Sequence, residues 1–129
     1  MAFRVVRPDE LEWTTRPHEP DEAPRHVTEL SDLARFGHTR ANIWRYEPGA
    51  KGRRHRHKNQ EETFVVLSGT LTMFVGDPPE ELDVPQGGLV HVEAGTPLQS
   101  VNQSDEELVL YAYGTPPESE RAEILDSAV

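Results

Sequence analysis

The stretch that most constrains the fold reads Gly49-Ala-Lys-Gly-Arg-Arg-His55-Arg-His57-Lys-Asn-Gln-Glu61-Glu62-Thr-Phe-Val-Val-Leu-Ser-Gly69. Alternate residues of an extended strand project from the same face, so His55 and His57 would lie about 6.6 Å apart along the strand with both imidazoles on one side. An apolar run follows Glu62 and ends at Ser68-Gly69, which predicts a turn into a paired strand. Two imidazoles and one carboxylate suit divalent iron, manganese, zinc or nickel. The stretch therefore predicts a metal site built on strands.

Short strand patterns separated by glycine and proline turns surround this stretch. The candidates are residues 39–46, 63–67, 70–75, 80–84, 89–92, 97–102 and 107–113. Short strands at such regular spacing favour an antiparallel sandwich or small barrel over a parallel sheet with crossover helices. We therefore expect an all-β domain.

The two ends of the chain differ from this middle part. Residues 1–37 combine a strand-like start at 3–6 with a segment at 16–25 that is too rich in proline and charge for a regular element. We expect these residues to form an N-terminal arm that packs on the barrel or exchanges with a second copy. At the other end, Thr115-Pro-Pro-Glu118 has the pattern of a helix start, which predicts a short C-terminal helix over 121–125.

This division assigns the arm to residues 1–37, the barrel to 38–115 and a short helix and tail to 116–129. With 129 residues the chain is long enough for one core but not for two. Cysteine is absent, which excludes thiolate ligands and fits a reducing cytoplasm. The charge of -10 argues against nucleic acid as a partner, and the apolar segments are too short for a signal peptide or a membrane span.

The quoted stretch resembles the first motif of the cupin superfamily. That motif runs Gly, five residues, His, one residue, His, three or four residues, Glu, six residues, Gly. Gly49, His55, His57, Glu62 and Gly69 fill its positions with the four-residue spacing. Five residue types at fixed distances make the match specific.

The second cupin motif is matched only in part. It runs Gly, five residues, Pro, one residue, Gly, two residues, His, three residues, Asn. Gly87, Gly95 and Asn102 are in register, but Glu93 replaces the proline and Leu98 replaces the last histidine ligand of the family. Because leucine cannot coordinate a metal, at most three of the usual four ligands remain.

The resemblance implies a cupin jelly roll, an antiparallel β-barrel with a metal ion in its mouth, a small-molecule ligand and a homodimer. Similar proteins include dioxygenases, isomerases, decarboxylases and simple binding modules, so the reaction type stays open. With Leu98 at the position of the fourth ligand, two alternatives remain. Either His55, His57 and Glu62 hold a divalent ion as a three-ligand site, or the metal is absent and the cavity binds a ligand without catalysis.

Several further residues are candidates for the site. His91, which alternates with two valines, or Gln99, which would need a bulge, could replace the missing ligand. Arg53 is in phase with the histidines and would orient an anionic molecule, whereas we expect Arg54, Arg56 and Lys58 to face outward. The predicted substrate pocket contains Arg53, Gln60, Leu98, Trp44, Tyr46, Phe64 and Met73, and Tyr111 is a further wall candidate.

Overall fold

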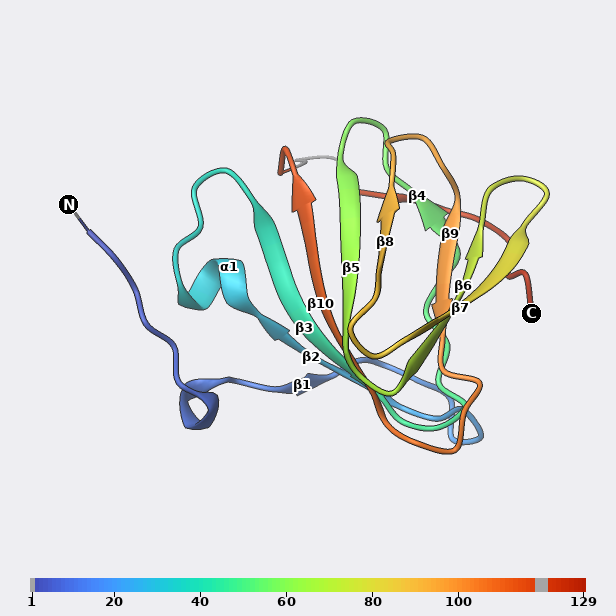
Figure 1. Cartoon of the computed structure of the whole chain (residues 1–129), viewed down its shortest axis with the longest axis horizontal. Helices are drawn as coiled ribbons and strands as arrows, with labels where there is room; N and C mark the ends of the chain where they lie inside the picture. The colour runs from blue at the N-terminus through green and yellow to red at the C-terminus, as the bar shows by residue number, and fades with distance from the viewer. Residues whose placement is uncertain (1, 118–120) are drawn as a thin grey trace.

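The computed structural model describes residues 2–117 and 121–129, which fold into two antiparallel sheets facing each other (Figure 1). The six-stranded sheet has the order β1-β2-β3-β10-β5-β8 and the five-stranded sheet the order β11-β4-β9-β6-β7. Their bounds are β1 Thr14–Thr15, β2 Arg25–Glu29, β3 Arg40–Tyr46, β4 His55–Arg56, β5 Glu61–Ser68, β6 Thr70–Val75, β7 Glu80–Pro85, β8 Leu89–Val92, β9 Leu98–Val101, β10 Leu108–Thr115 and β11 Glu123–Ile124. The predicted all-β jelly-roll architecture is confirmed.

The core lies between the two sheets and follows from alternation along the strands. In β10, Leu108, Leu110 and Ala112 are buried while the residues between them are partly exposed, as expected for a strand with one face on the core. The five-stranded sheet contributes Leu71, Met73 and Leu98, all at most 2% exposed. This packing closes one end of the barrel, and the other end is lined by polar side chains.

The turn between β5 and β6 depends on Gly69. Its φ of +81° lies in the left-handed region that favours glycine. A Cβ at this position would also lie 2.5 Å from the backbone oxygen of Glu107. Gly69 therefore allows β5 to turn into β6 close against the start of β10. The predicted turn is present, but the predicted pairing of the two strands is wrong, because β5 lies in the six-stranded sheet and β6 in the five-stranded sheet.

The N-terminal residues extend the six-stranded sheet. β2 pairs with β3 along its whole length, and β1 pairs with β2, so both strands add to the sheet of their own chain. A 3-10 helix (Pro8–Glu10) and a short helix α1 (Leu30–Leu33) flank them. The strand expected at residues 3–6 is wrong: no described residue pairs with this segment, and Phe3 and Val5 are 80% and 57% exposed.

The predicted C-terminal helix is also wrong for the part that the structure describes. None of residues 121–129 is helical, and Glu123 and Ile124 form β11, which pairs antiparallel with β4. Tertiary pairing outweighs the local helix signal here, because the backbone of Leu125 donates to the Arg54 carbonyl and the carboxylate of Glu123 accepts two hydrogen bonds from Arg56. Glu118, the capping residue of the prediction, lies outside the described residues.

None of the helices within residues 2–117 and 121–129 has the length and apolar character needed to cross a bilayer.

Candidate metal centre and its cavity

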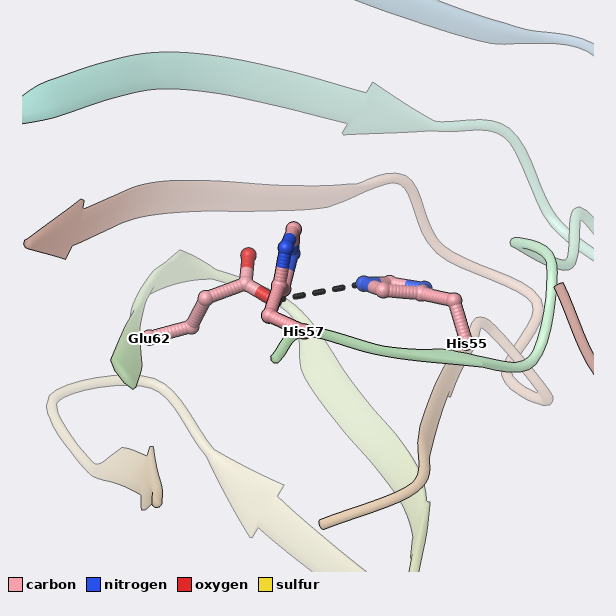
Figure 2. Close-up of side chains that lie close together, drawn as sticks. All are labelled: His55, His57 and Glu62. Atoms are coloured by element: carbon pink, nitrogen blue, oxygen red, sulfur yellow. Dashed lines mark hydrogen bonds and ion pairs between the residues drawn. The ribbon is translucent and has the colours of Figure 1, made fainter. Parts of the chain in front are cut away.

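The three predicted ligands come from two different sheets and meet at the open end of the barrel. His55 lies in β4 and His57 directly after it, in the five-stranded sheet, whereas Glu62 is the second residue of β5 in the six-stranded sheet. Figure 2 shows both imidazoles turned toward the Glu62 carboxylate. The site is therefore assembled where residues 55–62 cross from the five-stranded to the six-stranded sheet.

The ligand atoms lie close enough to share one ion. Nε2 of His55 is 3.2 Å from Oε1 of Glu62, and Nε2 of His57 is 2.8 Å from the same oxygen. The two rings stand edge to face with their centroids 5.2 Å apart. One ligand atom from each of the three residues lies within 4.8 Å of the other two. Each side chain is between 12% and 22% exposed, so the cluster is sheltered but reachable.

The hydrogen bonds of His55 fix which ring nitrogen faces the carboxylate. Nδ1 lies 2.9 Å from the carbonyl oxygen of Arg53, so Nδ1 carries the proton that it donates there. Nε2 is then the nitrogen that faces Glu62: it donates to the carboxylate when the ring is protonated, and it offers a lone pair when the ring is neutral. A histidine whose Nδ1 proton is held by a backbone carbonyl is the usual arrangement for a ligand that binds through Nε2.

The carboxylate is held in its charged form. Burial by itself would raise the pKa of Glu62, but hydrogen bonds and electrostatic interactions with His55 and His57 lower this pKa to about 2. Glu62 is thus an anionic acceptor near neutral pH, as a metal ligand must be.

The donor set fits a divalent ion. Two ligand atoms about 2.1 Å from one ion, at angles between about 90° and 109°, lie roughly 3.0–3.4 Å apart. The two nitrogen-to-oxygen distances of 3.2 Å and 2.8 Å are close to this range. Moreover, a lone pair on Nε2 of His55 would repel the lone pairs of the Glu62 oxygen that it faces. A cation between the two atoms removes this repulsion, and it can be a proton or a metal ion.

Leu98 stands beside this cluster. It is the register partner of His55 across the β4–β9 pair, so the two side chains project from the same face of the sheet. Leu98 is 2% exposed and belongs to the core cluster below the ligands. The position that would hold a fourth ligand is therefore filled by an apolar side chain.

A cavity of about 360 Å³ opens above the three ligands. Of the predicted pocket residues, the cavity wall includes Arg53, Gln60, Trp44, Tyr46 and Phe64.

The remaining pocket candidates lie elsewhere. Leu98 and Met73 are buried in the core and not at the cavity wall, and Tyr111 packs against Tyr113 at a separate depression on the surface. Gln60, although it lines the cavity, donates from Nε2 to the carbonyl of Pro116 and packs against Gly114. Gln60 thus supports the wall at the end of β10.

The two candidates for a replacement ligand point away from the cluster. His91 bonds to the Thr63 hydroxyl and lies 3.6 Å from Glu61, with its side chain 44% exposed. Gln99 faces the opposite side of its sheet, where its amide contacts Gly52, Ser127 and Ala128. The regular alternation of β9, which turns Leu98 toward the core between the sheets, turns Gln99 to the opposite face, where the C-terminal tail buries it.

Sequence reasoning missed three arginines of the cavity wall. Arg16, Arg25 and Arg40 come from the segment before β2, from β2 and from β3. The segment at 16–25 reads as a surface arm, and no motif links it to the histidines. Only the pairing of β2 with β3 brings Arg25 next to Trp44 and Tyr46.

The basic residues around the histidines separate as strand alternation predicts, with one difference. Arg53 lines the cavity, and Arg56 pairs with Glu123 on the outer face. Arg54 also avoids the metal cavity, but its side chain is only 13% exposed and bonds to the carbonyls of Gly76 and Asp126. Arg54 therefore anchors the C-terminal tail and is not simply solvated.

Comparison with known families supports this architecture. Residues 42–113 match the model of a family described as the cupin domain, which is more than half of the chain. No curated protein matches the sequence.

Several solved structures are similar. A sugar phosphate isomerase of the cupin superfamily from Silicibacter pomeroyi has 25% identity and a TM-score of 0.75, with 88% of this chain and 76% of that chain covered. A protein predicted to be an oxalate decarboxylase, from Thermotoga maritima, has 17% identity and a TM-score of 0.77, with 88% and 100% covered. The polyketide cyclase of Streptomyces resistomycificus has 14% identity and a TM-score of 0.78, with 98% and 89% covered. The last two likenesses concern the fold alone.

Proposed function

The chain belongs to the cupin domain family, and from that premise we propose that it binds a divalent metal ion through His55, His57 and Glu62 and acts on a small organic molecule in the cavity above them. The observation that carries the proposal is the convergence of two Nε2 atoms on one ionised carboxylate, from two sheets, at the floor of a cavity of about 360 Å³. Iron, manganese, zinc and nickel all suit this donor set.

The residues divide into ligands and supporting groups. His55, oriented by the Arg53 carbonyl, together with His57 and Glu62 would hold the ion. A divalent ion bound there would serve as a Lewis acid toward an oxygen of the bound molecule. Trp44 and Phe64 supply apolar wall on the side of the six-stranded sheet, which limits the water that reaches the bound molecule.

A second candidate function has a specific observation in its favour. Leu98 fills the fourth ligand position with a buried apolar side chain, so the site can provide at most three protein ligands from the predicted set. A cupin that binds a small molecule without catalysis, with a structural or absent metal, would tolerate this change. Under that alternative the cavity would bind its ligand equally well in metal-free protein.

Metal analysis separates the two candidates. The full chain is freed of metal by chelation, reconstituted in turn with iron, manganese, zinc and nickel, and desalted before the metal content is measured. The proposal predicts about one ion per chain, lost in the His55→Ala, His57→Ala double variant. A matched control is His91→Ala, which removes an imidazole outside the cluster. Wild-type protein that retains none of the four metals would contradict the proposal.

Assembly and location remain proposals. We propose a homodimer that uses the N-terminal arm, because Phe3 and Val5 are exposed apolar side chains in the single chain. Light scattering on the full chain and on a Phe3→Ser, Val5→Ser variant tests this. An unchanged dimer in the variant would exclude these arm residues as the dimer contact. The cytoplasmic location rests on the lack of cysteine in the sequence.

A further inference from the structure

Arginines gather at one wall of the metal cavity in a protein whose charge is -10. Arg16, Arg25 and Arg53 line the metal cavity and also line an adjacent cavity of about 310 Å³. The second cavity adds Lys51 and Arg54 and faces one carboxylate, that of Glu22. The junction of the two cavities is therefore strongly positive.

These three arginines make no ion pair with a described carboxylate, unlike five other arginines of the chain. Within residues 2–117 and 121–129, no carboxylate lies within 4.0 Å of the guanidinium of Arg16, Arg25 or Arg53. Ion pairs are instead made by Arg7, Arg40, Arg45, Arg54 and Arg56 with Glu10, Glu29, Glu107, Asp77 and Glu123, respectively. The positive charge at the junction is thus available to a bound anion.

Arg25 is held in place by aromatic rings. Its guanidinium carbon lies 5.0 Å from the centre of the Trp44 ring and 5.5 Å from that of Tyr46. Stacking of this kind orients a guanidinium without using its N–H donors. Gly52 makes room for it, because a Cβ there would lie 3.0 Å from the Tyr46 hydroxyl and 3.5 Å from Nη1 of Arg25.

The arginine group adjoins the metal ligands directly. Arg53 precedes His55 by two residues, and its carbonyl accepts the His55 Nδ1 hydrogen bond. A molecule bound at the junction would therefore extend into the cavity above His55, His57 and Glu62.

We propose that Arg16, Arg25 and Arg53 form a subsite for the phosphate group of a phosphorylated small molecule, whose remainder reaches the metal centre. A ligand with a single carboxylate would need only one guanidinium, because one guanidinium can bind a carboxylate in bidentate fashion. Three guanidiniums without an ion-pair partner in the protein exceed that need. A phosphate dianion has three oxygens and twice the charge, which matches three forked donors. The phosphate subsite stands on the arginines alone, and the placement of the remainder rests on the proposed function.

Titration calorimetry with inorganic phosphate tests the subsite in metal-free full chain. Wild type should show saturable binding, and acetate should bind more weakly than phosphate. Arg25→Gln and Arg53→Gln should each weaken phosphate binding about tenfold. Because Arg25 also packs on aromatic rings, the exposed Arg53 provides a variant that does not disturb the core.

Arg45→Gln is the matched control. Arg45 lies in β3 between Trp44 and Tyr46 but on the opposite face, where it pairs with Glu107, and its loss changes the charge equally. It should leave phosphate binding unchanged. Equal weakening by Arg45→Gln, tighter binding of acetate than of phosphate, or no saturable phosphate binding by wild type would overturn the subsite. The metal content of reconstituted protein, measured separately, shows which proposal fails. If the chain binds phosphate but retains none of the four metals after reconstitution, only the metal centre is refuted. If it retains a metal but does not bind phosphate, only the subsite is refuted.

Discussion

Replacing Leu98 by histidine should create the missing fourth ligand. Leu98 and His55 are register partners in antiparallel strands, so their Cβ atoms lie about 4.5–5.5 Å apart on the same face. An imidazole at position 98 would therefore start within reach of the ion held by His55, His57 and Glu62. We expect Leu98→His to raise metal affinity and, without metal, to lower stability.

The two effects can be estimated separately. Leu98 is buried to 2% exposure, so removing its side chain from the core costs about 1.5–3 kcal/mol of unfolding free energy in metal-free protein. Structural zinc sites with four ligands bind with about 10–16 kcal/mol, or about 3 kcal/mol for each ligand. A fourth ligand is thus expected to tighten metal binding by roughly a hundredfold.

Competition with a chromophoric chelator gives the zinc affinity, and thermal unfolding with and without zinc gives the stability. A ligand that binds only folded protein raises the unfolding temperature according to its affinity. Zinc should therefore raise the unfolding temperature of Leu98→His by more than that of wild type. Leu98→Asn is the control, since it places a polar side chain without an imidazole at the same position. Folded Leu98→His with wild-type zinc affinity would refute the placement of Leu98 at the fourth ligand position.

Three further substitutions test other parts of the account. Gly69→Ala should lower the unfolding free energy by about 1–3 kcal/mol in urea titrations, because the φ of Gly69 is +81° and a Cβ there would meet backbone. The control Gly37→Ala should change the unfolding free energy little, because a Cβ at Gly37 has open space. Equal effects of the two substitutions would contradict this. Gly52→Ala should weaken phosphate binding through the crowded Tyr46 hydroxyl, and unaltered binding would argue against the proposed arrangement. Gln99→Ala should lower the unfolding free energy by about 1–3 kcal/mol and speed hydrogen exchange in the C-terminal tail, because its buried amide bonds to Ser127 and Ala128. Unchanged exchange rates would show that the tail is held by other contacts.

The local part of the site is readable from the sequence. Strand alternation puts His55 and His57 on one side, where both rings reach Glu62. The same alternation separates Arg53 from Arg56, and Leu98 from Gln99. These relations depend only on neighbours in one strand, so a single sequence contains them.

Features that depend on strand pairing across the chain are not readable in this way. Arg16 and Arg25 reach the cavity because β2 pairs with β3, which no local pattern specifies. The C-terminal segment has the composition of a helix start, yet Arg56 and Gln99 hold it extended along β4. In both cases contacts between distant residues outweigh local propensity.

A crystal of the full chain soaked with zinc or manganese, with anomalous diffraction measured at the absorption edge of that metal, tests the central claim most directly. The account predicts one anomalous peak about 2.0–2.3 Å from Nε2 of His55, Nε2 of His57 and a carboxylate oxygen of Glu62. A metal peak at another group of residues, or none at these three side chains at saturating metal, would contradict it.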